Sequence, residues 1–239
     1  MNWIAIPTIT AYNELVACVD SILNSNLENI SLVIAINGGN SDILDYCQKL
    51  THEKLREFKY FFNSDNLGCS ASWNLMAQYA FMNGAKSVLI INDDLIFSDP
   101  DGIVNMFKVS AENPEALIIG NVNAFSSFVL TTKVYKQVGQ FDENFWPAYF
   151  EDNDYHHRCD LEGIKTIKVE AGIMTVGSVS IKTNERLAAL NNLTFKYNQQ
   201  YFEDKWGGPP GCTKFSKAFD GDRNKIWSVK QQYELGKLI

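Results

Sequence analysis

Short apolar runs alternate with longer helical patterns through the first hundred residues of the chain. The runs have the length of strands, and the stretches between them have the length of helices. The strand candidates are Trp3–Ile6, Leu32–Ile36, Lys59–Phe62 and Val88–Ile91. The helix candidates are Glu14–Leu23, Asp42–Glu57 and Ser70–Met82. This alternation predicts βαβ units, and hence a mostly parallel sheet with helices on both faces.

The pattern changes in the middle of the chain. Leu117–Val122 and Phe128–Thr132 have the character of strands without a helix between them, which predicts a mixed or antiparallel portion. A helix at Glu151–Leu161, a strand at Lys165–Val169 and a helix at Arg186–Phe202 are expected to follow. Glycines and prolines then make Trp206–Gly211 a loop. We therefore expect an α/β protein with one domain over residues 1–211, and a tail at 212–239 that packs on it.

Composition narrows the possible classes of protein. Hydrophobic residues make up 46% of the 239 residues, so a sizeable core can form. The formal net charge of -7 argues against nucleic acid as a partner, because a negative protein repels phosphates. Anionic ligands would have to be held locally, by a cation or by backbone N–H groups.

The sequence also suggests a location. No signal peptide and no apolar window of about 20 residues, the length of a membrane-spanning helix, is found. The five cysteines are scattered and form no C-x-x-C pair, which favours reduced thiols. We expect a cytoplasmic protein in which the sequons at Asn29 and Asn192 have no role.

The most informative segment follows the fourth predicted strand. Val88–Ile91 is apolar, and the chain then continues Asn92-Asp93-Asp94. Ligands of parallel α/β sheets bind beyond the carboxyl ends of the strands, which is where these two acids lie. Successive side chains of a strand face opposite sides, so Asp93 and Asp94 are expected to have different roles. Carboxylates together with substrate phosphates are the usual ligands of Mg²⁺, so a cation site is one hypothesis and a solvated turn is the other.

A second acidic segment follows an aromatic cluster. Glu151, Asp152 and Asp154 come after Trp146, Tyr149 and Phe150. Acids stabilise the start of a helix, and Asp154 can pair with Arg158 four residues later, so a structural account covers part of the pattern. A carboxylate at a pocket wall can also serve as a base, and Asp152 is our candidate.

The two histidines that follow do not predict a metal site. His156 and His157 are adjacent, and adjacent side chains on a helix diverge by about 100°. They cannot easily bind one ion together.

Polar loops follow the first three strands as well. They contain Thr8 and Tyr12, then Asn37 and Gly38, then Asn66 and Gly68, the last pair followed by Asn74 on the next helix. Neither the phosphate-loop motif nor G-x-G-x-x-G is present, which disfavours kinases, ATPases and dinucleotide enzymes.

Taken in order, these pieces resemble the family-2 glycosyltransferases of the GT-A fold, over about residues 3–206. The resemblance includes Val138–Glu143 and the segment Lys205-Trp206-Gly207-Gly208. It implies a donor half at about 1–98 and an acceptor half at about 99–211. It also implies a nucleotide-sugar donor, a divalent cation (Mn²⁺ or Mg²⁺), and a glycan, lipid-linked or protein acceptor. Peripheral contact with a membrane is compatible with it.

The resemblance also assigns residues. The donor is expected at Thr8, Tyr12, Asn37, Asn66, Gly68, Asn74 and Asp93. Asp94 is expected to bind the metal, and Asp152 to act as the base of an inverting single displacement. Trp146, Glu151 and Trp206 are expected on the acceptor side.

Two positions depart from the family pattern. An acid often precedes the Asn-Gly turn in the family, and Ile36 stands there in this chain. Many members carry a late histidine near the metal or the diphosphate, and Gly172–Ser178 contains none.

Two other functions remain open. A sugar-phosphate nucleotidyltransferase would share the sheet and the carboxylates, but it usually has a basic, glycine-rich first loop, and residues 8–13 contain no basic residue. A degenerate sugar-binding module without activity is the second alternative, and the retained acids argue against it.

Overall fold

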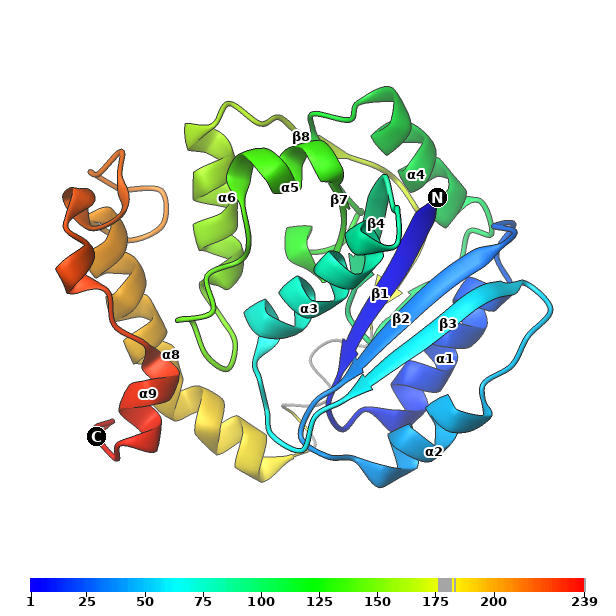
Figure 1. Ribbon diagram of the computed structural model, residues 1–239, viewed down its shortest axis with the longest axis horizontal. Helices are drawn as coiled ribbons and strands as arrows, with labels where there is room; N and C mark the ends of the chain where they lie inside the picture. The colour runs from blue at the N-terminus through cyan, green and yellow to red at the C-terminus, as the bar shows by residue number, and fades with distance from the viewer. Residues whose placement is uncertain (176–181, 183, 239) are drawn as a thin grey trace.

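A seven-stranded mixed sheet forms the centre of the protein (Figure 1). The computed structural model describes residues 1–175, 182 and 184–238. The strands lie in the order β3-β2-β1-β4-β7-β6-β8. Their bounds are β1 Asn2–Thr8, β2 Ile30–Ile36, β3 Leu55–Phe62, β4 Ser87–Ile91, β6 Leu117–Ile119, β7 Ser127–Thr131 and β8 Thr166–Lys168.

The direction of the strands divides the sheet. β3, β2, β1 and β4 are parallel to one another, as the alternation of the sequence predicts. β7 runs antiparallel to β4 and to β6, and β8 is parallel to β6. The predicted mixed portion is therefore confirmed, and it adjoins the parallel portion at β4.

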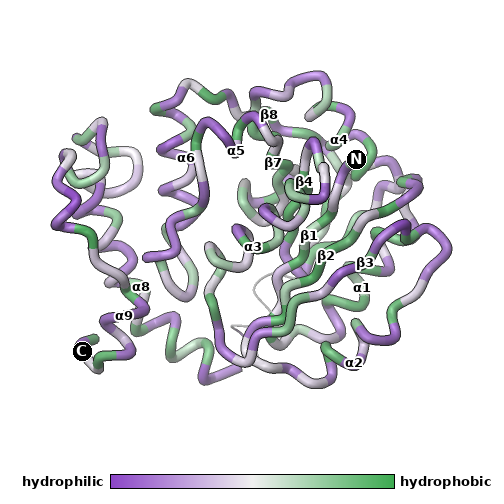
Figure 2. The backbone as a smooth tube through the Cα atoms, viewed as in Figure 1, coloured by the Kyte–Doolittle hydropathy of each residue, from purple (hydrophilic) through white to green (hydrophobic). Residues whose placement is uncertain are grey.

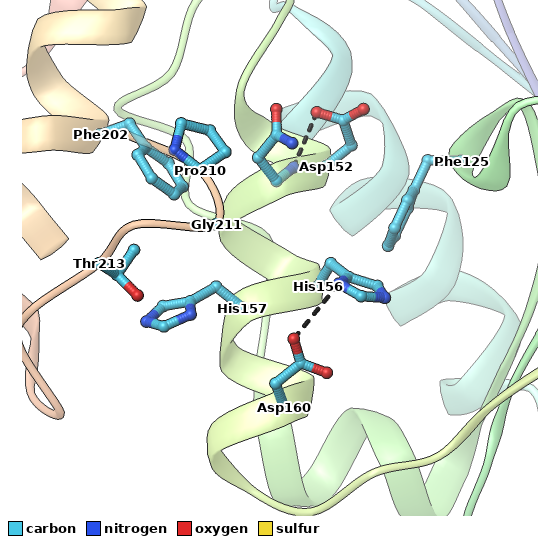
Figure 3. A pocket seen from close by; sticks show the side chains of 10 residues that line it. Phe125, Asp152, His156, His157, Asp160, Phe202, Pro210, Gly211 and Thr213 are labelled. Atoms are coloured by element: carbon cyan, nitrogen blue, oxygen red, sulfur yellow. Dashed lines mark hydrogen bonds and ion pairs between the residues drawn. The ribbon is translucent and has the colours of Figure 1, made fainter. Parts of the chain in front are cut away.

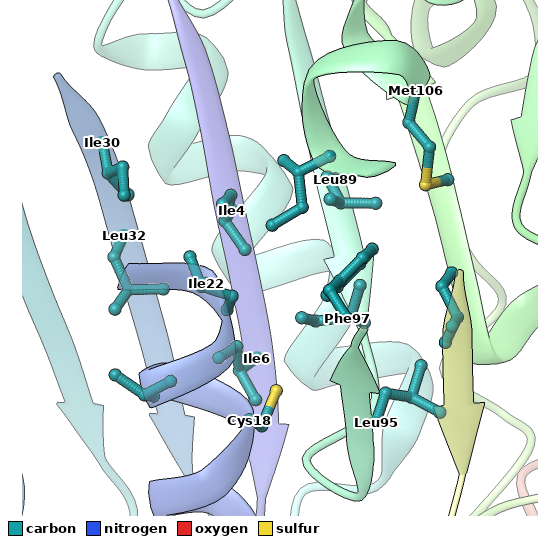
Figure 4. Close-up of a cluster of buried hydrophobic side chains, with 14 of the residues drawn as sticks. Ile4, Ile6, Cys18, Ile22, Ile30, Leu32, Leu89, Leu95, Phe97 and Met106 are labelled. Carbon is teal, nitrogen blue, oxygen red and sulfur yellow. The ribbon is translucent and has the colours of Figure 1, made fainter. Parts of the chain in front are cut away.

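Helices cover both faces of the sheet because the strands are apolar on both sides (Figure 2). Along β1, Ile4 and Ile6 face one helical layer, whereas Trp3 and Ala5 face the other. The first layer, shown with its core in Figure 4, contains α1 (Tyr12–Leu23), α2 (Ser41–Lys49) and α4 (Gly102–Glu112). The second contains α3 (Cys69–Met82), α5 (Thr132–Val138) and α6 (Glu151–Leu161).

Several details differ from the sequence-based expectations. Trp206 ends α8 (Glu185–Trp206) and does not begin a loop. The elements that were not predicted include α5, β5 (Leu95–Phe97), β9 (Ile173–Thr175) and α9 (Val229–Glu234). The helix predicted to reach Glu57 ends at Lys49, because Leu55–Phe62 pairs with β2 instead. α4 was not predicted either. The strand predicted to reach Thr132 ends at Thr131, whose side chain caps α5 by accepting a hydrogen bond from the Val134 N–H.

A small second sheet forms between β5 (Leu95–Phe97) and β9 (Ile173–Thr175), which are antiparallel. Phe97 and Ile173 join the core of the α1 layer. This pairing ties the chain just after Asp94 to the chain just before the undescribed residues 176–181.

The C-terminal part packs through a third apolar cluster. α8 (Glu185–Trp206) contributes Tyr201, Phe202 and Trp206 to it. The tail contains η2 (Ala218–Gly221), η3 (Arg223–Lys225) and α9 (Val229–Glu234). It contacts the rest of the protein through a hydrogen bond from the Val229 N–H to the Asn144 carbonyl.

A buried ionic cluster joins α6 to α8. Asp154 is fully buried, and it accepts a hydrogen bond from the Trp206 indole N–H (2.9 Å) and pairs with Lys205 (2.6 Å). Arg158 pairs with the other Asp154 oxygen at 2.9 Å, as the i,i+4 spacing predicts. Lys205 also reaches Asp142 at 2.7 Å. Burial opposes ionisation of Asp142, but Lys205 outweighs it and lowers the pKa of this carboxyl.

We expect Lys205→Met to lower the free energy of unfolding by about 3–5 kcal/mol, because the buried Asp154 and the half-buried Asp142 lose their shared cation. The matched control is Lys133→Met, which removes an exposed pair with Glu115 and should cost about 0–1 kcal/mol. Urea unfolding of both variants measures the difference. Equal losses would show that the buried cluster contributes no more than a surface pair.

Candidate active site

The carboxyl ends of β1, β2 and β4 bring four predicted donor-site residues together. Thr8 ends β1, and the Asn37 N–H just after β2 donates to the Thr8 carbonyl at 2.8 Å. Asp93 and Asp94 follow β4, the other neighbour of β1. The Thr8 hydroxyl is buried there and has no hydrogen-bond partner among the described residues. Three separate segments of the sequence thus converge on one edge of the sheet.

The two aspartates have the character of a cation site. Asp94 is 7% exposed, and the Oδ2 atom of Asp93 is buried without a hydrogen-bond partner in the part of the chain that the structure describes. Burial, followed by the charge of Asp94, raises the pKa of Asp93 to about 7, although the Thr8 hydroxyl opposes the shift.

No cluster of three or more metal-binding side chains occurs among the described residues. Asp93 and Asp94 could hold a cation only together with oxygens from outside the described residues, such as those of phosphate or water. The late stretch in which the sequence lacks the family histidine extends beyond Thr175 into undescribed residues.

The other donor-side residues are distributed around this edge. Tyr12 begins α1, is 39% exposed, and packs edge-to-face against Tyr46. Asn37 donates from its amide to the Ser72 hydroxyl on α3, and its Oδ1 atom is buried with no partner among the residues described. Tyr12 and Asn37 thus offer a ring and a carbonyl oxygen to a ligand.

The loop of Asn66 and Gly68 contacts the segment that leads to α6. The side-chain oxygen of Asn66 accepts a hydrogen bond from the Gly68 N–H. The backbone carbonyl of Asn66 accepts one from the Trp146 indole N–H at 2.9 Å. Gly68 has φ +88°, and a Cβ there would lie 2.9 Å from the Trp146 ring and 3.0 Å from the Pro147 carbonyl. Only glycine fits this close approach.

Asn74 does not have the expected place. It is 1% exposed, and its amide donates to the Phe141 carbonyl and to Glu143 while accepting from the Phe141 N–H. Because both ends of the amide are engaged within the protein, Asn74 holds the segment before Trp146 and is not available to a donor.

The start of α6 presents the second set of carboxylates. Glu151 is 6% exposed, its Oε2 atom has no partner among the described residues, and burial raises its pKa to about 8. Asp152 is half-buried and accepts from the Asn153 N–H at 2.8 Å. Burial also raises the pKa of Asp152, while hydrogen bonds from backbone N–H groups at the start of the helix, and then His156, act against the rise.

A cavity of about 600 Å³ opens beside Asp152 (Figure 3). His156 and His157 both line it but point to different sides of α6, so the prediction that they do not bind one ion together agrees with the geometry. His156 lies 3.5 Å from Asp160, and His157 packs against Trp206. The cavity therefore runs across the outer face of α6.

Trp146 and Trp206 were expected on the acceptor side, but neither lines this cavity. They are 5% and 2% exposed, and their indole N–H groups are used by Asn66 and Asp154. They support the walls from behind. The aromatic walls are instead Phe125 and Phe202, which the sequence analysis did not single out.

Cys69 links the helix α3 to the segment before Glu151, because its N–H donates to the Pro147 carbonyl at 2.8 Å. It begins α3, and burial raises its pKa well above the usual value. The negative charges of Glu151, Asp152 and Asp93 add to this rise. A single side chain therefore lies within electrostatic reach of both the β4 edge and the start of α6.

The sequence profile described as glycosyl transferase family 2 matches residues 3–182. The chain belongs to this family. The family predicted from the sequence is confirmed, and with it the class of enzyme. A search of curated protein sequences found no match.

Solved structures confirm the GT-A fold. A mannosyltransferase from Pyrobaculum calidifontis, in complex with GDP-Man and Mn²⁺, is similar with a TM-score of 0.58 and 12% identity, over 71% of this chain and 54% of that one. TarS of S. aureus (residues 1–349) gives 0.59 and 12%, over 99% and 78%. GalNAc-T7 with UDP, GalNAc and Mn²⁺ gives 0.61 and 11%, over 86% and 50%.

The chain spans about half the length of the first of these structures. Within the described residues, no helix combines the length and the apolar character needed to cross a bilayer.

We expect Glu151→Gln to flatten the dependence of stability on pH. Folding raises the pKa of Glu151 to about 8. Above about pH 4.3 the unfolded state therefore loses a proton that the folded state keeps. As a result, wild-type stability falls as the pH rises from about 4.3 to about 8. Glutamine removes this penalty. The variant should gain ~2–4 kcal/mol over wild type between pH 5 and pH 9.

Urea unfolding at several pH values measures this gain. Glu53→Gln, at an exposed loop position, should leave the wild-type slope unchanged. An unchanged slope in Glu151→Gln would contradict the burial of a protonated carboxyl.

Proposed function

We propose that this protein transfers a sugar from a nucleotide-sugar donor to an acceptor hydroxyl, with a divalent cation and with inversion at the anomeric carbon. The observation that carries the proposal is the convergence of Thr8, Asn37 and Asp93-Asp94 at the carboxyl ends of β1, β2 and β4, joined to the segment before Glu151 by the hydrogen bond from the Cys69 N–H to the Pro147 carbonyl. A carboxylate pair that would hold a cation for the diphosphate and a carboxylate that would accept the proton of a hydroxyl thus act on the same part of the molecule.

The donor binds at the edge of β1, β2 and β4 in this proposal. Thr8, Tyr12, Asn37 and Asp93 flank the nucleotide, and Asn66 and Gly68 shape the loop beside it. Three relatives support such a donor, since their structures contain GDP-Man with Mn²⁺, UDP-GlcNAc, and UDP with GalNAc and Mn²⁺. Asp94 would hold the cation, which when bound neutralises charge on the departing diphosphate.

Asp152 acts as the base. It accepts the proton of the acceptor hydroxyl as the hydroxyl oxygen forms a bond to the anomeric carbon. The bond from that carbon to the diphosphate oxygen breaks at the same time, and its electron pair leaves with the nucleoside diphosphate. One displacement from the face opposite the leaving group inverts the configuration. Partial burial keeps Asp152 a stronger base than a solvated aspartate.

The alternatives have less support. Residues 8–13, which follow the first strand, contain no basic side chain to hold a triphosphate, as a nucleotidyltransferase requires. A binding module without activity has no need of buried carboxyl oxygens without partners, such as those of Asp93 and Glu151. The five free thiols support a reducing, cytoplasmic setting.

Asp94→Asn should reduce cation-dependent turnover of the donor at least about 100-fold, because one charge of the proposed cation site is lost. The assay incubates the protein with UDP- and GDP-sugars and Mn²⁺, with or without EDTA, and measures release of nucleoside diphosphate. Asp45→Asn makes the same change at an exposed position of α2 and should retain wild-type turnover. Release that is unaffected by EDTA or by Asp94→Asn would refute the cation site.

Asp152→Asn should separate binding from transfer. The amide cannot accept the proton, so transfer should fall about 10²- to 10⁴-fold, while the affinity for nucleoside diphosphate with Mn²⁺ stays within about twofold. Calorimetry measures the binding of nucleoside diphosphate, and release of nucleoside diphosphate from the donor in the presence of acceptor measures the transfer. Full transfer in this variant would remove Asp152 from the role of base.

A further inference from the structure

The cavity beside α6 extends well beyond the proposed base. Asp152, His156 and Asp160 are spaced four residues apart and therefore share one face of the helix. Eight residues of α-helix rise about 12 Å, so this face can accommodate more than one sugar ring. The proposed chemistry uses only Asp152 at one end, and the remaining lining is available to recognise the acceptor.

The charge of the lining is one-sided. Among the lining residues that the structure describes, Asp152 and Asp160 are acidic, and there is no lysine or arginine. A phosphate, sulfate or carboxylate in the cavity would face these carboxylates without a cation to compensate.

The nearest cations on the flanking helices are already engaged. Arg158 on α6 and Lys205 on α8 both pair with the buried Asp154, and Lys205 pairs with Asp142 as well. Lys214 is exposed and follows Thr213 in the chain, but it does not line the cavity. A negatively charged acceptor would therefore find no free cation on the described walls.

Groups that recognise neutral hydroxyls are present instead. His157 lines the cavity, where its ring packs edge-to-face against Trp206. Burial lowers the pKa of His157, which favours the neutral ring with one donor and one acceptor nitrogen. The carboxylates accept hydrogen bonds from hydroxyls, and a hydroxyl can bond to the imidazole in either direction.

Apolar surfaces complete the walls. Phe125 stands on one side of α6, and Phe202 and Pro210 stand on the other (Figure 3). Flat apolar groups that flank a few polar ones are typical of small-molecule sites, and they suit the C–H faces of sugar rings. The volume of about 600 Å³ is in the range of such sites.

We propose that the acceptor is a neutral, hydroxyl-rich glycan of more than one ring. It lies along the face of α6 that carries Asp152, His156 and Asp160, with its reacting hydroxyl at Asp152 and a further ring toward Asp160. Glycans that carry phosphate, sulfate or carboxylate in the bound part are excluded by charge. This inference rests on the proposed glycosyl transfer.

The kinetic test uses matched pairs of acceptors. Each pair is a disaccharide of glucose, galactose, mannose or N-acetylglucosamine, and the same disaccharide with a phosphate on its non-reacting ring. With a donor that the protein turns over, the neutral member should accelerate release of nucleoside diphosphate at least tenfold more than its phosphorylated partner. A preference for phosphorylated acceptors would overturn the proposal.

A charge reversal locates the effect. Asp160→Lys should reduce the preference for the neutral member at least fivefold, because it places a cation at the open end of the cavity. Asp45→Lys makes the same change on α2, away from the cavity, and should preserve the wild-type preference. Equal changes in both variants would show that overall charge, and not the cavity, sets the preference.

A binding measurement distinguishes this inference from the proposed function. Saturation-transfer NMR on Asp152→Asn protein, with the same pairs at millimolar concentration, should show transfer to the neutral members and at least fivefold less to the phosphorylated ones. Binding of this kind without turnover of any donor would refute the transferase and retain the neutral-glycan cavity. Donor turnover with binding of phosphorylated members only, or of neither, would refute the cavity assignment alone.

Discussion

The neutralisation of one buried charge determines how α6 and α8 pack together. Asp154 is fully buried, and an isolated carboxylate in that position would be strongly destabilising. Lys205 and Trp206 from the end of α8 and Arg158 from α6 together satisfy it. Because these groups come from two helices, the ionised Asp154 is stable only when α8 lies against α6. The cavity beside Asp152 exists as a result of that packing.

Acids only a few residues apart acquire different properties from their surroundings. Asp154 is compensated by cations and remains a structural anion. Glu151, three residues earlier, has a buried oxygen without a partner among the described residues, and burial favours its protonated form. Asp152 between them is half-buried and open to the cavity. One helical turn thus provides an anchor, a buried acid and a candidate base, and the difference lies in burial and partners.

The parallel half of the sheet was predictable because each of its strands is a short apolar run that ends in polar residues. The order of the motifs also located Thr8, Asn37, Asp93 and Asp94 at one edge. The helix over Gly102–Glu112 was missed although Ile103, Met106 and Phe107 have helical spacing.

The cavity was not predictable, because Phe125 and Asp152 are far in the sequence from Phe202 and Pro210 and meet them only through tertiary packing. Asn74 and Trp206 match family positions, but their hydrogen bonds lie within the protein.

The close contact of Gly68 with Trp146 and Pro147 has a consequence for how such an enzyme can diversify. The backbone of Gly68 packs against the ring of Trp146 with no room for a methyl group. The loop of Gly68 and the segment that leads to α6 are therefore expected to move together. We therefore expect a new acceptor preference to arise more readily from substitutions in the cavity walls than from substitutions at the contact between Gly68 and Trp146. A substitution at that contact would disturb the proposed donor and acceptor sites together.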